Sequence, residues 1–295
     1  MSQDREQILP LAWFLLIMLT LIWGSSFILI KRGLEVFSAG EVGALRMLSA
    51  SIVMTPIAIR KLGTSNRRQL LFLLSVGFLG SFFPAFLFAK AETRIDSSMA
   101  GVLNALTPMF VVIVGALFYN QKFPLRTGLG LFIGFGGTLL LMTTGASGMF
   151  SGISYYALFI VLATVLYGFN VNIIKYNLYG LKAVNLTALS MFLVLPVAAG
   201  YLFGSTDFVL KMEQQEGAWL SLFYVDILRI FGTPDAITLF NKLVQMTSPV
   251  FTSSVTYLIP IVAVLWGLFD GERLQFGHYL GMATILLGVY ITNRR

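Results

Sequence analysis

The sequence predicts an all-α polytopic membrane protein with ten transmembrane helices arranged as two inverted five-helix repeats. Apolar residues make up 57% of the 295 residues and charged residues only 11%, whereas a soluble domain carries about 25% charged residues. Apolar runs of about 20 residues, each long enough to cross a bilayer, recur along the whole chain. An internal repeat divides these runs into two groups of five. The bilayer is therefore the expected solvent of the folded chain.

The apolar runs give ten predicted spans with short connections. Ten spans place both termini on the same side of the membrane. If that side is the cytoplasm, the inner connections hold about twice as many Lys and Arg residues as the outer ones. Because cytoplasmic loops are enriched in Lys and Arg, we expect cytoplasmic termini and a bacterial inner (plasma) membrane location. The predicted spans lie near residues 10–30, 38–59, 70–90, 97–119, 127–144, 153–173, 184–204, 218–240, 248–269 and 276–292.

Two constant spacings relate the halves of the sequence. At a spacing of 144 residues, the segment around Trp23 is echoed by the segment around Tyr167, and further on the spacing becomes 152 residues. We expect one repeat over residues 1–145 and the other over 153–295. Each holds five spans, and an odd number forces the second copy to enter the membrane in the opposite orientation. The loop charges agree, because the connection between spans two and three is basic and its second-half counterpart is mainly acidic.

Composition argues against several classes of function. The net charge of +7 is scattered over short connections and forms no single basic face, so we expect no nucleic-acid partner. With no cysteine and a single histidine, His278, the chain lacks the residues for thiolate chemistry or a histidine metal cluster. No credible Ser/His/Asp set or carboxylate pair stands out. We therefore predict no catalytic residue, no metal and no cofactor, and hence no enzyme.

Both halves of the chain contain short motifs that carry a family resemblance. They are Ile22-Trp23-Gly24-Ser25-Ser26-Phe27, Ala44-Leu45-Arg46, Ser97-Ser98-Met99-Ala100, Leu106-Thr107-Pro108, Thr247-Ser248-Pro249-Val250, Tyr257-Leu258-Ile259-Pro260 and Trp266-Gly267 to Asp270-Gly271-Glu272. With these motifs nearly the whole chain resembles the EamA-type family of the drug/metabolite transporter superfamily. The resemblance implies ten spans built from two five-helix repeats around a central cavity. It also implies export of amino acids, metabolites or toxic compounds.

Two features depart from that family pattern. Asn120, the first-half counterpart of Glu272, stands where the family often has an acid. Span eight contains Asp226 and Arg229, although a charge at the centre of a span costs about 2.5–3.5 kcal/mol. These two residues share a helical face, and we expect them either to line the cavity or to form a purely structural ion pair. Pro234 in the same span is expected either to break the helix or to kink it.

The other candidates for the substrate cavity are polar or aromatic residues within spans. Each has a structural alternative: the tryptophan packs helices, the arginine, which matches the family's usual span-two arginine, bonds helix-end carbonyls, and the others join helices for about 0.6 kcal/mol each. We expect Lys90 and Lys242 to extend to the membrane interface, and Glu272 to be an exposed loop acid. The candidates are Trp23, Arg46, Asn104, Thr107, Asn170 and Tyr257.

The sequence thus predicts an inner-membrane exporter of small metabolites, either amino-acid-like or amphipathic, that works by alternating access. Its expected partners are a small-molecule substrate, with or without a coupling ion or proton, and the lipid bilayer. Monomer and homodimer both remain open. Two alternatives also remain. A lipid-handling flippase would show a lateral apolar groove, and a non-transporting membrane receptor or assembly factor would need similar helix packing.

Overall fold

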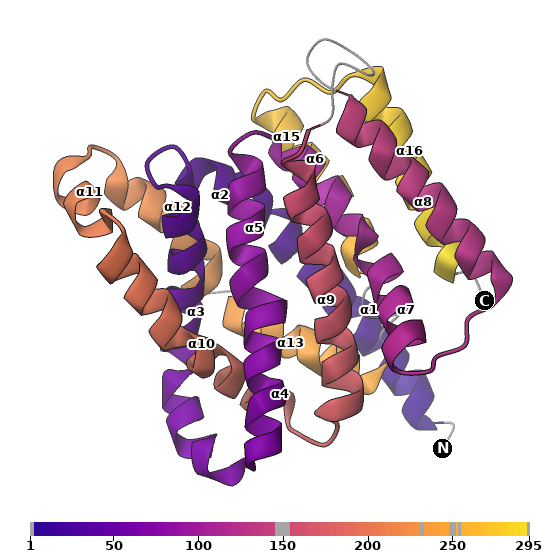
Figure 1. Ribbon diagram of the computed structural model, residues 1–295, viewed down its shortest axis with the longest axis horizontal. Coiled ribbons are helices and arrows are strands. Elements are labelled where there is room, and N and C mark those ends of the chain that lie inside the picture. The colour runs from indigo at the N-terminus through magenta and orange to yellow at the C-terminus, as the bar shows by residue number, and fades with distance from the viewer. Residues whose placement is uncertain (1–2, 145–153, 231–232, 248–251, 253–254, 294–295) are drawn as a thin grey trace.

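The computed structural model describes residues 3–144, 154–230, 233–247, 252 and 255–293. Within those ranges every regular element is a helix, which confirms the all-α class (Figure 1). The first half of the chain contains α1 (Gln3–Gly24), α2 (Ser26–Gly33), α3 (Ala39–Lys61), η1 (Leu62–Thr64), α4 (Arg67–Gly77), η2 (Phe78–Phe82), α5 (Phe83–Glu92), α6 (Ser97–Leu103), η3 (Asn104–Leu106), α7 (Thr107–Phe118) and α8 (Leu125–Thr143).

The second half is built in the same way from helices joined by short connections. It contains α9 (Ala157–Asn177), α10 (Ala183–Ser205), α11 (Phe208–Gln214), α12 (Ala218–Ile230), α13 (Thr233–Met246), α15 (Val255–Phe269) and α16 (Phe276–Asn293).

Six helical stretches in the described residues are long and apolar enough to cross a membrane. They follow predicted spans one to four, six and seven, with ends shifted by a few residues. Two more apolar helices, Leu258–Phe269 and Phe276–Gly288, are shorter. Membrane-spanning helices are thus confirmed, and the full count of ten stays a prediction. The six stretches are Pro10–Gly33, Ala39–Lys61, Arg67–Glu92, Ser97–Phe118, Ala157–Asn177 and Ala183–Ser205.

The structure adds detail to the region of predicted spans seven and eight. The connection between predicted spans seven and eight contains a short helix, α11. Predicted span eight, 218–240, is divided between α12 and α13, and the two residues between them, which include the glycine beside Pro234, lie outside the described residues. The division therefore coincides with residues that the structure does not describe, and the single span stays a prediction.

A capping box fixes the start of α3. The Glu41 carboxylate accepts a hydrogen bond from the backbone N–H of Ser38 at 2.7 Å, and the Ser38 hydroxyl accepts one from the backbone N–H of Glu41. Two of the unpaired backbone N–H groups at the helix start, those of Ser38 and Glu41, are hydrogen-bonded in this way. Glu41 also accepts a hydrogen bond from Lys211 Nζ at 2.6 Å. This ion pair joins α11 to the start of α3.

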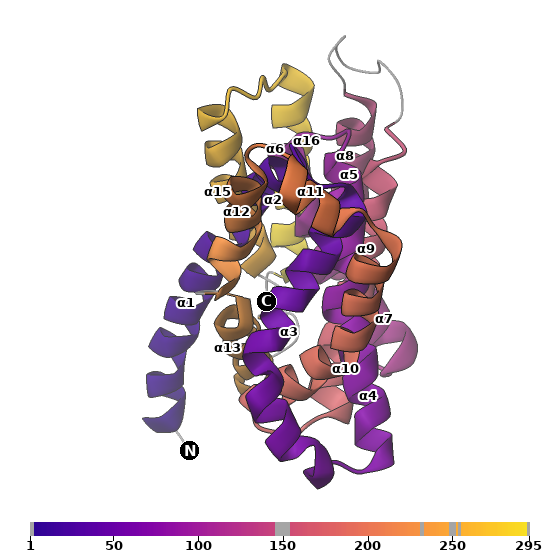
Figure 2. The same ribbon diagram turned by 90° about the vertical axis from the view of Figure 1, so that its left-hand side faces the viewer.

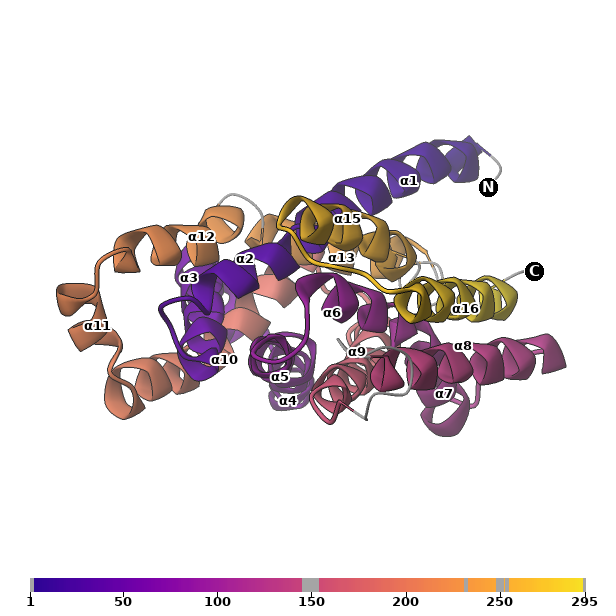
Figure 3. The ribbon, with the colours of Figure 1, turned by 90° about the horizontal axis from the view of Figure 1, so that it is seen from above.

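The helices form one elongated bundle. Seen from above, α3, α10 and α11 lie at one end, α8 and α16 lie side by side at the other, and α4, α5, α6 and α9 lie between them (Figure 3). In the side view α13 lies between α1 and α10 (Figure 2). The connection between α3 and α4 lies at the lower end of Figure 1, whereas α11, in the corresponding second-half connection, lies at the upper end.

Two interruptions of helical geometry occur inside the first half. A π-helical turn, η2, separates α4 from α5, and a 3₁₀ turn, η3, separates α6 from α7. Pro84 and Pro108 follow these turns, and a proline lacks the N–H that would continue regular helix hydrogen bonding. Such turns free backbone groups and frequently accompany functional sites. Gly80, within η2, allows close approach of α9, because a Cβ there would lie 2.5 Å from Asn170 Cγ.

Candidate functional site

A cavity that is partly open to its surroundings lies in the middle of the bundle. Its walls come from both halves of the chain, and η2 and η3 both contribute to them. The apolar part of the wall includes the aromatic rings of Trp23, Phe88 and Phe240. Trp23 and Phe240 lie 5.1 Å apart between ring centroids. A ligand of metabolite size would therefore meet aromatic faces as well as polar groups.

Five of the residues singled out in the sequence line this one cavity. They are Trp23 at the end of α1, Arg46 on α3, Asn104 in η3, Thr107 at the start of α7 and Asn170 on α9. The structure therefore brings together residues that are as much as 147 positions apart in sequence (170 − 23). Their roles in binding remain part of the proposal below.

The other three predicted site residues are not placed. The side chains of Asp226, Arg229 and Tyr257 lie outside the described residues, although their backbones belong to α12 and α15. Lys90 and Lys242 are exposed and are absent from the cavity wall.

Sequence reasoning missed several polar wall residues, among them Tyr167, Ser190, Asn241 and Thr256. The internal repeat contained a signal for three of them. At the spacing of 144 residues, Tyr167 corresponds to Trp23 and Ser190 to Arg46, and at 152 residues Thr256 corresponds to Asn104. The counterpart of each candidate residue in the other half could therefore have been predicted to line the cavity.

The repeat spacings also relate most of the remaining wall. Further pairs that both line the cavity are Ser26 and Asn170, Phe27 and Val171, Met47 and Met191, Ala85 and Ile237, Phe88 and Phe240, and Thr107 and Ile259. Equivalent positions of the two halves thus face the same space from both sides.

Most buried polar groups near the cavity are hydrogen-bonded, as buried polar groups generally are. Asn172 donates to the carbonyl oxygens of Val111 and Gly168 at 3.0 and 2.9 Å. Asn241 donates to the Thr187 hydroxyl at 2.8 Å. Asn170 differs, because its Oδ1 atom is buried without a hydrogen-bond partner among the described residues. Asn170 itself lines the cavity, so this unpaired acceptor lies within the cavity wall.

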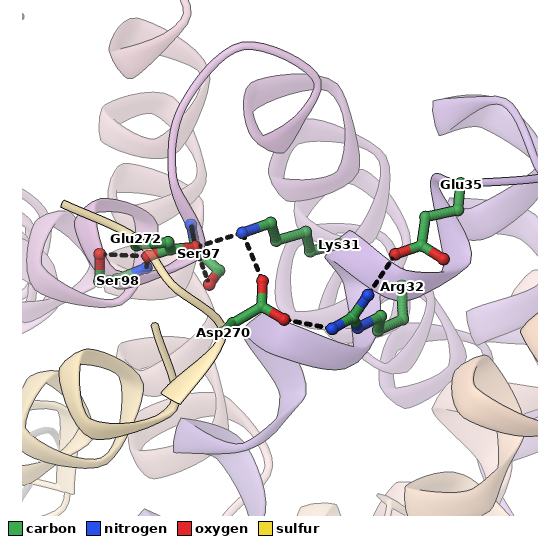
Figure 4. Close-up of polar contacts among 7 residues, drawn as sticks. All are labelled: Lys31, Arg32, Glu35, Ser97, Ser98, Asp270 and Glu272. Atoms are coloured by element: carbon green, nitrogen blue, oxygen red, sulfur yellow. Dashed lines mark hydrogen bonds and ion pairs between the residues drawn. The ribbon is translucent and has the colours of Figure 1, made fainter. Parts of the chain in front are cut away.

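A second polar site joins the two halves at one end of the bundle. It is the Glu272 cluster, in which the buried Glu272 carboxylate accepts hydrogen bonds from Lys31 Nζ at 2.9 Å and from the hydroxyls of Ser97 and Ser98 at 2.7 and 2.6 Å (Figure 4). The backbone N–H groups of both serines donate as well. Its members are Lys31, Arg32, Glu35, Ser97, Ser98, Asp270 and Glu272.

Asp270 extends this cluster along α2. It forms an ion pair with Lys31 Nζ at 2.6 Å and another with Arg32, which also pairs with the exposed Glu35 at 2.6 Å (Figure 4). The α15–α16 connection is thereby tied to α2 and to the start of α6. The expectation that Glu272 is an exposed loop acid is wrong, because the fold places its carboxylate over the N-terminus of α6.

The surroundings of Glu272 keep its carboxylate charged. Burial acts to raise its pKa, but the hydrogen bonds from Lys31, Ser98 and Ser97 outweigh burial and lower the pKa to about 2. Hydrogen bonds to the ionised form favour that form. Glu272 is therefore ionised across the whole physiological pH range.

Lys175 makes a different contact at the end of α9. Its Nζ atom donates to the backbone carbonyl oxygens of Val244, Gln245 and Thr247 at 3.3, 3.4 and 2.5 Å. These carbonyls lie at the C-terminal end of α13, where a cation compensates the unpaired acceptors and the helix dipole. Lys175 corresponds to Lys31 at the spacing of 144 residues. The two equivalent lysines therefore have different partners, which are backbone carbonyls for Lys175 and carboxylates for Lys31.

An apolar helical bundle around a cavity with polar and aromatic walls has the form of a membrane transporter. The comparisons with known proteins agree. The model of the EamA-like transporter family matches residues 10–143 and again residues 154–294. This chain belongs to the EamA-like transporter family, within the drug/metabolite transporter group, which confirms the family indicated by the sequence motifs.

Relatives of this chain from other organisms are also described as transporters. An uncharacterized inner membrane transporter of Escherichia coli K12, YedA, is 26% identical over 290 residues, covering 97% of this chain and 91% of its own. An uncharacterized transporter of Archaeoglobus fulgidus is 25% identical over 289 residues, covering 96% of this chain and 99% of its own. A solved crystal structure superposes with a TM-score of 0.63 over 96% of both chains at 15% identity, and therefore shares the fold.

Proposed function

We propose that this protein exports small metabolites across an inner membrane by alternating access around the central cavity. The observation that carries the proposal is the wall of that cavity, in which residues related by the repeat spacings face the same space. A binding site at the interface of two repeats is accessible from either side when one repeat tilts against the other. The aromatic and polar groups of the wall suit amino-acid-like or amphipathic compounds.

The two repeats are proposed to be inverted, with five spans each over residues 1–145 and 153–295. The two matches to the family model support this division. The α3–α4 connection and its counterpart containing α11 lie at opposite ends of the bundle, which supports inversion (Figure 1). The first connection holds Arg60, Lys61, Arg67 and Arg68, so the positive-inside rule favours cytoplasmic termini.

Labelling with a membrane-impermeant maleimide tests this orientation, and the absence of cysteine in the natural sequence gives a clean background. We expect Glu213→Cys on α11 to react in intact cells, and Arg68→Cys at the start of α4 to react only after permeabilisation. Both side chains are exposed. Reaction of both residues from the same side would contradict the inverted arrangement, and unmodified protein serves as the blank.

In the proposed cycle, the Glu272 cluster closes one end of the cavity. It joins α2 and α6 to the α15–α16 connection through buried charged contacts. Opening at that end must separate these elements, whereas the Lys175 contacts lie on other helices and can persist. The α11 end of the bundle, which the loop charges place outside, also holds this cluster, so the cluster would be the outer closure.

Access to a single cysteine in the cavity tests alternating access without a known substrate. Ser81→Cys, on the cavity wall in η2, is expected to react with an impermeant maleimide in both right-side-out and inverted vesicles. Joining Lys31→Cys to Asp270→Cys with a short bifunctional thiol reagent should abolish the outside reaction and leave the inside reaction intact. Reaction from one side only in the absence of the cross-link would contradict alternating access. Cleavage of a reducible cross-linker should restore the outside reaction.

A further inference from the structure

A set of polar side chains joins the end of α7 to the end of α9. Gln121 Nε2, in the α7–α8 connection, donates to Asn172 Oδ1 at 3.1 Å and to the Tyr176 hydroxyl at 2.8 Å. The Tyr119 hydroxyl donates to Asn177 Oδ1 at 2.8 Å, and its ring stacks on that of Tyr176 with 4.9 Å between the centroids. These five residues form the Gln121 cluster. It connects the first half of the chain to the second.

The Gln121 cluster lies between the cavity wall and one end of the bundle. Both of its helices contribute to the wall, α7 with Thr107 and α9 with Asn170. Asn172 follows two residues after Asn170, and Tyr176 lies about 6 Å further along the helix axis. The α7–α8 connection lies toward the lower end of Figure 1, as the α3–α4 connection does, whereas the α15–α16 connection lies at the upper end. The Gln121 and Glu272 clusters therefore flank the cavity from opposite ends.

The two clusters share one backbone arrangement. The backbone N–H of Gln121 donates to the carbonyl oxygen of Gly115 at 3.0 Å, and that of Glu272 donates to the carbonyl oxygen of Gly267 at 2.9 Å. Each side chain folds back over its glycine, because an added Cβ would lie 2.9 Å from Gln121 Cδ or 3.0 Å from Glu272 Cδ. The two glycines correspond at the spacing of 152 residues. The structural counterpart of Glu272 is therefore Gln121.

One extra residue hides this equivalence in the sequence. Asn120 takes the place that the spacing assigns to Glu272, and its φ of 52° lies in the left-handed region that asparagine tolerates better than most residues. The partners on the other half also correspond. Arg32, which pairs with Asp270, is equivalent to Tyr176 at the spacing of 144 residues. The same joint thus occurs twice, once with charged groups and once with neutral ones.

The surroundings of Asn172 require a hydrogen-bond donor at position 121. Asn172 Nδ2 donates to the carbonyl oxygens of Val111 and Gly168 at 3.0 and 2.9 Å. Its Oδ1 atom, an acceptor, is therefore the atom that faces the α7–α8 connection. A carboxylate there would bring two acceptors together with no hydrogen between them, whereas the Gln121 amide supplies N–H groups. This geometry explains why the first-half joint contains no acid.

We propose that the Gln121 cluster closes the cavity at the end opposite the Glu272 cluster, and that Gln121 is the residue that holds this closure. Opening at either end must break the contacts of that end, while the equivalent contacts at the other end persist. Loss of the Gln121 contacts therefore favours the conformation that is open at their own end. This inference rests on the proposed function, because it assumes that the cavity opens to both sides in turn.

The experiment measures how fast Ser81→Cys reacts with an impermeant maleimide in right-side-out and inverted vesicles that contain the full chain. Gln121→Glu keeps the shape of the side chain but replaces its N–H donors by an acceptor. We expect the rate from the side on which Arg68→Cys reacts to rise and the rate from the other side to fall. Their ratio should increase about fivefold or more, as expected for the loss of one net hydrogen bond.

Three further variants of the Ser81→Cys protein surround this measurement. Tyr176→Phe removes one acceptor at a side chain that is 46% exposed, so the fold should persist and the ratio should rise by a smaller factor. Glu272→Gln weakens the opposite closure and should lower the ratio. Gln214→Glu makes the same chemical change as Gln121→Glu at an exposed residue of α11, and should leave both rates unchanged.

The direction of the two rates separates a closure from a merely structural contact. If Gln121 only held α7 against α9, its loss would loosen the bundle and raise both rates together. Such a parallel rise, an unchanged ratio or a lowered ratio would overturn the assignment, and Tyr176→Phe decides the matter if Gln121→Glu does not fold. One-sided reaction of Ser81→Cys without any further substitution would instead remove the transporter function, so the two failures are distinct.

Discussion

Replacing Glu272 by alanine is expected to lower the free energy of unfolding by about 3–5 kcal/mol, the range for removing one partner of a buried ion pair. The carboxylate accepts hydrogen bonds from Lys31, from both serine hydroxyls and from both serine N–H groups. Alanine leaves these donors without their acceptor in a buried place. Thermal or denaturant unfolding in detergent, followed by tryptophan fluorescence, measures the loss.

The control for this variant lies in the same cluster. Glu35 pairs with Arg32, but its side chain is 52% exposed, and exposed ion pairs contribute about 0–1 kcal/mol. Glu35→Ala should therefore change stability little. Equal losses in the two variants would mean that burial of the Glu272 carboxylate is not what holds the α15–α16 connection.

Glu272 should also make the stability of the protein depend on pH. Its pKa is about 2 in the folded protein, below the ordinary value of 4.5. A depressed pKa contributes stability that is fully present above pH 4.5 and is lost as the pH falls toward 2. The natural protein should hence lose stability between pH 5 and pH 3 more steeply than Glu272→Ala. Parallel pH profiles for the two proteins would contradict this assignment.

Replacing Gly77 by valine is expected to destabilise the protein and to deform the cavity. A Cβ on Gly77 would lie 2.4 Å from the backbone oxygen of Ser190 and 2.8 Å from Val194 Cγ1. Backbone cannot move aside as the end of a flexible side chain can, so α4 and α10 must separate. Overpacking of this kind costs about 1–3 kcal/mol. The neighbouring Val76 and Ser190 line the cavity, so ligand binding should weaken as well.

Gly63→Val provides the matched comparison. Gly63 lies in the exposed turn η1, and a Cβ there meets nothing within 4 Å. Unfolding measurements and binding of whichever probe the natural protein binds should both show little change. A Gly77→Val protein as stable as Gly63→Val would mean that α4 and α10 are not held in close contact at this point.

Local composition was enough to predict the solvent and the class of this protein. Apolar runs and the scarcity of charge predicted membrane helices within a few residues of α3 and α10, because transfer of such segments into a bilayer depends on local composition. The motifs identified the family. Hydropathy did not predict the short helix α11, because its 7 residues are too few and too polar to form an apolar run.

Only the tertiary structure decided which polar residues act together. The serines at the start of α6 and Glu272 are 174 residues apart at their nearest, and the burial of that carboxylate follows from helices closing over it. Glu92 passed unnoticed in the sequence because an acid at the end of a span normally faces water. Its burial without a hydrogen-bond partner among the described residues depends on how the surrounding helices meet, and the desolvation of a charge is a property of all its neighbours together.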